Sequence, residues 1–243
     1  MKDTLRVYAD HAAVSEALAE SITEQTATTS AEGFFYLALA GGNTPRTLYE
    51  LLATNFRDRI SWDRVHLFWG DERYVQPTDP QSNYRLVRES LLDHIKIPSS
   101  NVHQMRTDFE DPDDAAKHYE GVLREHFSTS WPTFSTVLLG LGADGHTASL
   151  FPGSPALEER KRWVSSTLGP NEPRLRLTLT LPALAHAKQV YFIVTGADKA
   201  DAIRRTLTDG NTPAARLVAE KPNAVFWTDA EASRYVRHDS ISS

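Results

Sequence analysis

Cysteine is absent from the 243 residues of this chain. Its absence excludes disulfide bonds, thiolate nucleophiles and cysteine-based metal sites. Long apolar runs are also missing, since none approaches the roughly 20 residues that a membrane-spanning helix needs. Charged residues interrupt the apolar ones in the first ten positions, which argues against a secretory signal peptide. We therefore expect a cytoplasmic protein without a membrane anchor.

An excess of positive charge is missing as well. The chain has 26 Lys and Arg against 32 Asp and Glu, a formal net charge of −6 at pH 7. Because nucleic-acid binding favours a basic surface, we expect no nucleic-acid partner. A modest net charge still leaves room for a local basic pocket that binds a small anion. Nothing in the sequence demands a subunit interface, and we expect a monomer.

Several catalytic signatures are absent too. The chain has no His-Glu-x-x-His zinc motif and no Walker-type phosphate loop. Ser149 does not stand in a Gly-x-Ser-x-Gly elbow, which argues against a serine hydrolase. His118 and His126 share one predicted helix but lie eight residues apart, more than two turns. We expect both of these histidines to face solvent rather than to bind a metal ion.

Apolar, β-rich runs alternate with helical patterns along the whole chain, without repeats or a convincing linker. This alternation predicts one α/β domain over residues 1–243, with a mostly parallel, Rossmann-like central sheet and helices on both faces. The back-to-back strands after Trp163 predict a smaller mixed β portion. We expect strands at 5–9, 34–40, 65–70, 102–105, 134–139, 163–168, 175–181, 189–195 and 224–228. We expect helices at 12–28, from Pro45 onward, and at 83–94, 112–127 and 197–207.

A glycine turn follows the second predicted strand. It comprises Gly41, Gly42, Asn43 and Thr44, and Pro45 then suits the first position of a helix with Thr44 as its N-cap. Free backbone N–H groups at a helix start attract anions, and glycines allow a close approach. The turn is therefore either a phosphate site or an ordinary tight turn capped by Thr44.

Further charged groups follow other predicted strands. A loop carrying Asp71, Glu72 and Arg73 comes directly after the third strand, and the Arg73 guanidinium suits a phosphate or a carboxylate. Arg174 and Arg176 lead into the strand at 175–181, and Lys199 follows the strand at 189–195. The structural alternative for each is a solvated surface charge. Several such groups at strand ends favour an anion site instead.

The most informative segment follows the strand at 134–139. Its residues 140–152 read Gly-Leu-Gly-Ala-Asp-Gly-His-Thr-Ala-Ser-Leu-Phe-Pro. The Gly-x-Gly-x-x-Gly spacing formally matches a dinucleotide fingerprint, but Asp144 inside the turn would repel a pyrophosphate. Asp144 and His146 better suit general acid–base chemistry, because imidazole titrates near neutral pH. The structural alternative is a loop histidine beside a capping aspartate.

Taken together, these segments resemble the 6-phosphogluconolactonase family. The resemblance runs in order through most of the chain and is most specific at residues 142–152. Its other parts lie at residues 40–45, 69–73, 82–84, 176–182 and 195–199. The resemblance implies the sugar-phosphate isomerase/lactonase type of α/β fold. It also implies hydrolysis of 6-phospho-D-glucono-1,5-lactone to 6-phospho-D-gluconate, in the oxidative pentose phosphate pathway, without a metal or another cofactor.

Roles for individual residues follow from the resemblance. His146 would be the general base that activates water, and Asp144 would orient its imidazole. The phosphate would bind the turn at Gly41, Gly42, Asn43 and Thr44, with cations from Arg73, Arg176 and Lys199. Asp71 is a further candidate substrate contact. Arg174 competes with Arg176, although Arg176 directly precedes Leu-Thr-Leu-Thr. The oxyanion donors would be backbone N–H groups of the glycine turns, or Arg73.

Two other functions remain alternatives. Glucosamine-6-phosphate deaminase shares the Gly-Gly-x-Thr-Pro turn and Asp-Gly-His, but follows the histidine with Ala-Phe-Asn-Glu-Pro. Phe151 stands where that glutamate would assist ring opening, and phenylalanine cannot transfer protons. Arg73 likewise follows the lactonase pattern, since the deaminase has an aromatic residue there. A non-catalytic sugar-phosphate binding module is the second alternative, and the presence of Asp144 and His146 weighs against it.

Overall fold

The computed structural model describes residues 4–29 and 33–236. Its centre is a seven-stranded sheet in which all paired neighbours run parallel. In spatial order its strands are β1 (Leu5–Tyr8), β10 (Val225–Asp229), β9 (Gln189–Val194), β6 (Thr136–Leu139), β2 (Phe35–Leu39), β3 (Val65–Trp69) and β5 (Val102–His103). The prediction of a mostly parallel sheet is confirmed.

A smaller antiparallel sheet lies beside the first one. Its order is β4 (Asp71–Arg73), β8 (Leu175–Leu179) and β7 (Val164–Leu168). β4 follows β3 after the single residue Gly70, whose carbonyl accepts a hydrogen bond from the Leu179 N–H at 2.8 Å. The two sheets are therefore joined where β3 ends, and the predicted mixed β portion is this second sheet.

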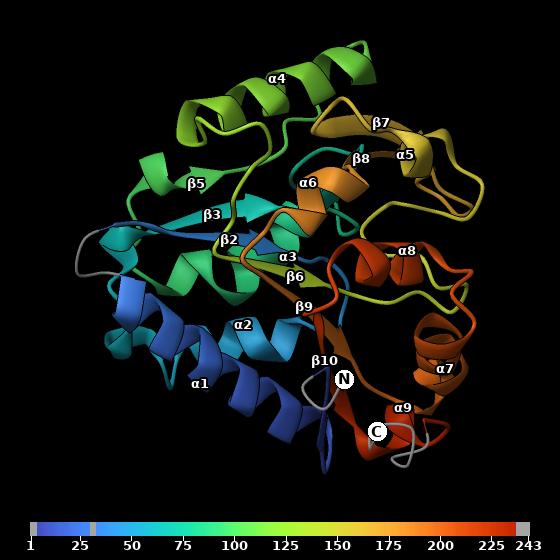
Figure 1. The fold of residues 1–243 in the computed structure, drawn as a ribbon. Helices are drawn as coiled ribbons and strands as arrows, with labels where there is room; N and C mark the ends of the chain where they lie inside the picture. The colour runs from blue at the N-terminus through green and yellow to red at the C-terminus, as the bar shows by residue number, and fades with distance from the viewer. Residues whose placement is uncertain (1–3, 30–32, 237–243) are drawn as a thin grey trace.

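Helices cover both faces of the central sheet (Figure 1). On one face lie α1 (His11–Thr29), α2 (Arg46–Ala53) and α3 (Asn83–Ser90). On the other lie α4 (Pro112–His126), α6 (Leu181–Ala185) and α8 (Pro213–Glu220), with α5 (Pro155–Glu158) near the small sheet and α7 (Ala200–Thr208) and α9 (Ala230–Ser233) near the β10 side. Within residues 4–29 and 33–236, no helix combines the length and apolar character that crossing a bilayer requires.

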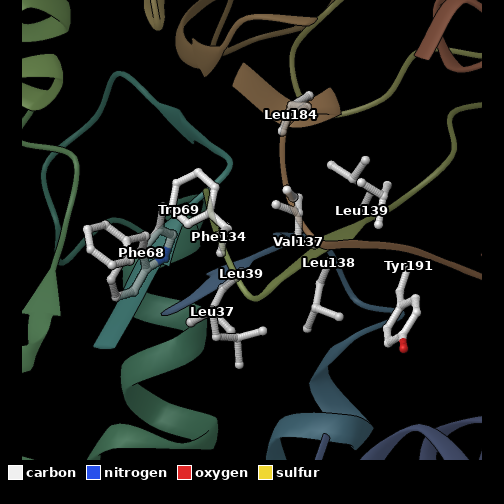
Figure 2. Close-up of a cluster of buried hydrophobic side chains, with 14 of the residues drawn as sticks. Leu37, Leu39, Phe68, Trp69, Phe134, Val137, Leu138, Leu139, Leu184 and Tyr191 are labelled. Atoms are coloured by element: carbon white, nitrogen blue, oxygen red, sulfur yellow. The ribbon is translucent and has the colours of Figure 1, made fainter. Parts of the chain in front are cut away.

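Alternating side chains of the strands build the core on both faces of the sheet. In β6, Val137 and Leu139 point towards Leu184 of α6, whereas Leu138 points to the opposite side (Figure 2). All of these side chains are at most 1% exposed. Burying each of them contributes about 1.5–3 kcal/mol relative to an exposed position. The apolar runs in the sequence are thus continuous because helices cover both sides of their strands.

The strand order reverses between β2 and β6. From β2 the chain moves outward to β3 and β5, and then returns to the other side of β2 with β6, β9 and β10. The loops that leave the carboxyl ends of β2 and β6 therefore diverge to opposite sides and leave a crevice. These are the two glycine turns singled out in the sequence.

Some local predictions are wrong. Residues 71–73 form strand β4 rather than a loop, because pairing with β8 supplies hydrogen bonds that the charged sequence does not reveal. Pro45 itself occupies the cap position of α2, without a side-chain cap, so Thr44 is not the N-cap. The strand predicted at 175–181 ends at Leu179 since Pro182 lies in the first turn of α6. The helix predicted at 197–207 opens with a 3₁₀ turn, Ala197–Lys199.

The prediction that His118 and His126 face solvent is also wrong. Both residues are of intermediate exposure. His118 packs against the ring of Phe109, with 5.3 Å between ring centroids. His126 lies against His103 of β5, with 4.3 Å between ring centroids. The two faces of α4 that carry these histidines are covered by loop and strand residues from elsewhere in the chain, which periodicity along one helix cannot show.

Candidate active site

A cavity of about 470 Å³ lies at the carboxyl ends of the strands, in the crevice beside β2 and β6. Turns after β2, β6 and β9 line it, together with β4 and β8 of the small sheet. Nine of the ten predicted site residues line this cavity: Gly41, Gly42, Asn43, Thr44, Asp71, Arg73, His146, Arg176 and Lys199. The tenth, Asp144, does not line the cavity but contacts the Nδ1 atom of His146. Residues far apart in the sequence thus meet at one place, as the strand-end positions predict.

The turn after β2 brings main chain close to the cavity. Gly42 has a φ of +87°, a backbone conformation that side chains disfavour. Gly41 lies so close to Asn83 that a Cβ atom on it would come within 1.9 Å of the Asn83 Oδ1. A side chain is therefore disfavoured at Gly42 by the backbone conformation and at Gly41 by the contact with Asn83. The turn ends at α2, whose unpaired N–H groups and dipole favour an anion nearby.

His146 is held by Asp144 in the turn after β6. Its Nδ1 lies 2.6 Å from Asp144 Oδ1, and its backbone N–H donates to the same oxygen at 3.1 Å. An ionised carboxylate only accepts hydrogen bonds, so the proton of the neutral imidazole resides on Nδ1. Nε2 is then left with a lone pair. The ring also packs on Phe151, with 4.7 Å between ring centroids.

Asp144 remains ionised in this arrangement. Partial burial opposes ionisation, but the backbone N–H and the imidazole of His146 outweigh it and lower the pKa of Asp144 below its usual value. Gly142 leaves the space that the ring occupies, since a Cβ there would lie 2.0 Å from His146 Nδ1. The turn therefore sets the tautomer and the position of the imidazole together.

Two arginines lie side by side at the cavity wall. Arg73 and Arg176 are register partners across β4 and β8. In the described part of the chain, the buried Nε atoms of both have no hydrogen-bond partner. Arg176 is only 8% exposed, and burial together with the neighbouring Arg73 lowers its pKa. Two adjacent guanidinium groups with unused donors are a binding site for an anion.

Arg174, the competing arginine, does not line the cavity. Its Nε donates to the Gly169 carbonyl at 3.3 Å, in the loop between β7 and β8. Two-residue alternation in a strand would turn Arg174 and Arg176 in the same direction, but β8 begins at Leu175 and Arg174 belongs to the loop before it. Lys199 does line the cavity, although its Nζ lies 3.5 Å from the Asp198 carboxylate.

Asp71 is buried and links β4 to the start of α3 and to the segment after β6. Its Oδ2 accepts a hydrogen bond from Ser149 Oγ at 2.6 Å. Asn83 Nδ2 donates to its backbone carbonyl at 2.9 Å and to Oδ1 at 3.2 Å. Sequence reasoning did not select Asn83 or Ser149, both of which line the cavity. The Ser-Asn-Tyr segment at 82–84 was a signal for Asn83, whereas nothing local singles out Ser149.

Glu72 positions the start of α3 against β4. Its carboxylate accepts hydrogen bonds at 2.7 Å from the backbone N–H groups of Arg73, Asn83 and Tyr84, and from Ser82 Oγ at 3.1 Å. Burial raises the pKa of Glu72 to about 7, and the three backbone donors oppose this rise. The side chain is only 2% exposed, so its contribution is to hold Asn83 in place beside Gly41.

The cavity offers no cluster of metal ligands. Among the described residues, the grouping that could hold a metal ion consists of His66, His103 and His126, and none of these lines the cavity. The arrangement at the cavity combines one imidazole with a free nitrogen, a phosphate-type anion site and backbone donors. It suits proton transfer to or from a small anionic ligand.

Known proteins share this arrangement of elements. A 6-phosphogluconolactonase from Synechocystis sp. is 39% identical over 230 residues, which span 92% of this chain and 94% of the relative. A 6-phosphogluconolactonase from Haemophilus influenzae is 35% identical over 82% of this chain and 86% of its own length. The solved 6-phosphogluconolactonase from Trypanosoma brucei superposes with a TM-score of 0.83 at 30% identity, covering 97% of this chain and 99% of its own.

A monomeric glucosamine-6-phosphate deaminase has the same fold, with a TM-score of 0.80 over 95% of this chain and 99% of its own. Its sequence identity is only 20%, so this likeness concerns the fold alone. Residues 9–227 match the sequence family described as "Glucosamine-6-phosphate isomerases/6-phosphogluconolactonase". The chain therefore belongs to the glucosamine-6-phosphate isomerase/6-phosphogluconolactonase family.

Proposed function

We propose that this protein hydrolyses 6-phospho-D-glucono-1,5-lactone to 6-phospho-D-gluconate. The observation that carries the proposal is that His146, held through Nδ1 by Asp144, shares one cavity with Arg73 and Arg176, whose buried Nε atoms have no hydrogen-bond partner among the described residues. The first pair suits a general base, and the second suits the phosphate of the substrate. The full-length relatives named 6-phosphogluconolactonase support the same activity.

In the proposed reaction, Nε2 of His146 removes a proton from water while the water oxygen attacks the lactone carbonyl carbon. The carbonyl π electrons move to its oxygen and form a tetrahedral oxyanion. When the carbonyl re-forms, the bond to the ring oxygen breaks, and this oxygen takes the proton from the imidazolium. Asp144 stabilises the imidazolium between the two steps. The ring-opened acid then ionises to the carboxylate product.

Donors for the oxyanion come from the cavity wall in this proposal. The Gly142 N–H already donates to the His146 carbonyl, and the Gly145 N–H donates to the Gly142 carbonyl, each at 2.9 Å. These two groups are therefore committed within the turn. Since this proposal assigns Arg73 to the phosphate, the remaining candidates are backbone N–H groups of the Gly41–Thr44 turn that do not contact the phosphate. A lactone is an activated ester, so the proposed chemistry needs no metal and no other cofactor.

The phosphate is proposed to bind Arg73 and Arg176, with the turn at 41–44 and Lys199 around it. We propose that the protein acts as a single-domain monomer. A sugar phosphate is charged and does not cross membranes unaided, and we propose the cytoplasm as the place of action. Deamination is disfavoured because Phe151, which precedes Pro152 as the deaminase glutamate precedes its proline, cannot transfer a proton; its ring packs against the proposed base instead.

The test is the hydrolysis of freshly generated lactone, coupled to 6-phosphogluconate dehydrogenase. The expected result is a rate well above spontaneous hydrolysis, with a loss of about 10²–10⁴-fold in kcat for His146→Ala, as for removal of a general base. His94→Ala is the matched control, because His94 is exposed, bonds to the Glu89 carbonyl and does not line the cavity. Its rate should equal that of the wild type.

Two outcomes would count against the proposal. A wild-type rate no faster than the spontaneous background would remove the lactonase assignment, and release of ammonia from glucosamine 6-phosphate would then establish the deaminase. An unchanged rate for His146→Ala, with lactone turnover intact, would instead remove only the assignment of the base.

A further inference from the structure

Three histidines meet on the side of the central sheet that carries β5, away from the cavity. His66 is in β3, His103 is in β5, and His126 is the last residue of α4. One ring nitrogen from each lies within 4.8 Å of the others. We propose that His66, His103 and His126 bind a divalent transition-metal ion such as Zn²⁺ through these three imidazole nitrogens.

One of the separations between the nitrogens is already close to that of a coordinated pair, and all three nitrogens lie within 4.8 Å of one another. His66 Nδ1 lies 3.0 Å from His103 Nε2. Two nitrogens bound to one tetrahedral Zn²⁺ at about 2.05 Å are separated by about 3.3 Å. A metal ion between these nitrogens replaces the hydrogen bond that joins them, with both lone pairs turned to the ion. His126, at the end of its helix, closes the set by a small movement of its side chain.

The backbone holds two of the three ligands firmly. β3 and β5 are paired, with Phe68 opposite His103, and the His66 and His103 rings are stacked with 6° between their planes. α4 lies over these strands (Figure 1). Phe68 packs on both His103 and His126, at centroid distances of 4.4 and 5.5 Å. The imidazoles are therefore preorganised by packing against an aromatic wall, which limits other arrangements of their nitrogens.

The donor set determines which ion is suitable. Neutral imidazoles favour zinc, copper, nickel and cobalt, whereas magnesium and calcium require oxygen ligands, and the grouping contains no carboxylate. His66 is 8% exposed, and the other two are of intermediate exposure. The ion thus has access from solvent, and water can complete its tetrahedral coordination.

This site is separate from the proposed active site. None of its histidines lines the cavity. His66 precedes Asp71 by five residues, about 17 Å along an extended chain. The ion would connect β5, a two-residue edge strand, and the end of α4 to the neighbouring strand β3. We expect it to stabilise this part of the fold and to leave lactone turnover unchanged.

The experiment titrates chelator-treated full-length protein, without an affinity tag, with Co²⁺ and separately with Zn²⁺. The expected result is one ion per chain and visible absorption bands of tetrahedral Co²⁺. We expect His103→Ala and His126→Ala each to weaken metal binding by at least about tenfold. Loss of a residue that only orients a metal ligand already costs about that much, and these histidines are ligands themselves. Zn²⁺ should raise the Tm of the wild type and not that of either variant.

Two control variants make the outcome decisive. His94→Ala removes an exposed histidine elsewhere and should bind as the wild type does. His146→Ala removes the histidine of the cavity and should also bind normally. The proposal is overturned if the wild type binds no ion, if folded His126→Ala retains wild-type affinity, or if His146→Ala abolishes binding. Circular dichroism of each variant verifies that its fold is retained.

Discussion

Replacement of Gly142 by alanine should displace the proposed base without unfolding the protein. A Cβ atom at this position would lie 2.0 Å from Nδ1 and 2.2 Å from Cε1 of His146, and 2.7 Å from Oδ1 of Asp144. The φ of Gly142 is not among the positive values of this chain, so alanine is compatible with the backbone of the turn. The side chains must therefore yield rather than the main chain.

The size of the effect follows from these distances. Ordinary contacts between such atoms begin at about 3.5 Å, so the imidazole must retreat by roughly 1.5 Å. That movement breaks the 2.6 Å bond between His146 and Asp144. Displacing a catalytic group by about 1 Å can cost about 100-fold in rate, and we expect a loss of this order in kcat. The broken bond is partly exposed and contributes only about 1 kcal/mol to the free energy of unfolding.

The assay compares kcat for lactone hydrolysis with the inhibition constant for the product, 6-phosphogluconate. Arg73 and Arg176 are untouched by the substitution, so the inhibition constant should stay within about threefold, a difference of well under 1 kcal/mol. Gly121→Ala is the matched control, since a Cβ on this glycine of α4 meets nothing. A Gly142→Ala enzyme with a kcat close to the wild type would refute the reasoning. An equal loss in product affinity would show that the whole turn had moved.

Two further predictions concern charge. Arg176→Ala should raise KM for the lactone about 10- to 100-fold with a much smaller change in kcat, because a hydrogen bond to a charged group contributes about 1.5–3 kcal/mol. Arg174 lies outside the cavity, so Arg174→Ala should leave KM unchanged. Equal effects of the two substitutions would contradict the assignment of Arg176 to the phosphate. Glu159 accepts hydrogen bonds from Lys161 and Arg162, which outweigh partial burial and lower its pKa to about 2. The stability that ionised Glu159 contributes is present above pH 4.5 and is lost as the pH falls towards 2. Between pH 6 and pH 4, the free energy of unfolding of the wild type, measured in urea, should therefore fall by about 1 kcal/mol more than that of Glu159→Gln. Parallel pH profiles of the two proteins would contradict this prediction.

Long apolar or periodic segments of the sequence were sufficient to predict most strands of the central sheet and its longer helices. In α1, Val14, Leu18 and Ile22 recur at four-residue spacing, and all three are at most 1% exposed. Short elements without such a pattern were missed, notably α5, α6, α8 and α9. A signal for α8 was present, because Thr212 caps it by accepting a hydrogen bond from the Ala215 N–H and Pro213 follows in the first turn.

Local chemistry in the sequence determined the candidate residues of the site. A glycine turn after a strand, a histidine two residues after an aspartate, and charged groups at strand ends are properties of short segments. Nine of these ten candidates line one cavity because parallel strands end at the same edge of the sheet and the strand order reverses there. Sequence position alone was enough to predict that meeting place.

The tertiary structure decided what no short segment contains. Pairing of β4 with β8 brought Arg73 opposite Arg176 and left Arg174 outside the cavity, although Arg174 and Arg176 look equivalent in sequence. The same kind of distant pairing brought His103 beside His66, and packing of α4 added His126. Contacts across 23 to 103 residues depend on register and helix packing, which hydrophobic periodicity within one element does not encode.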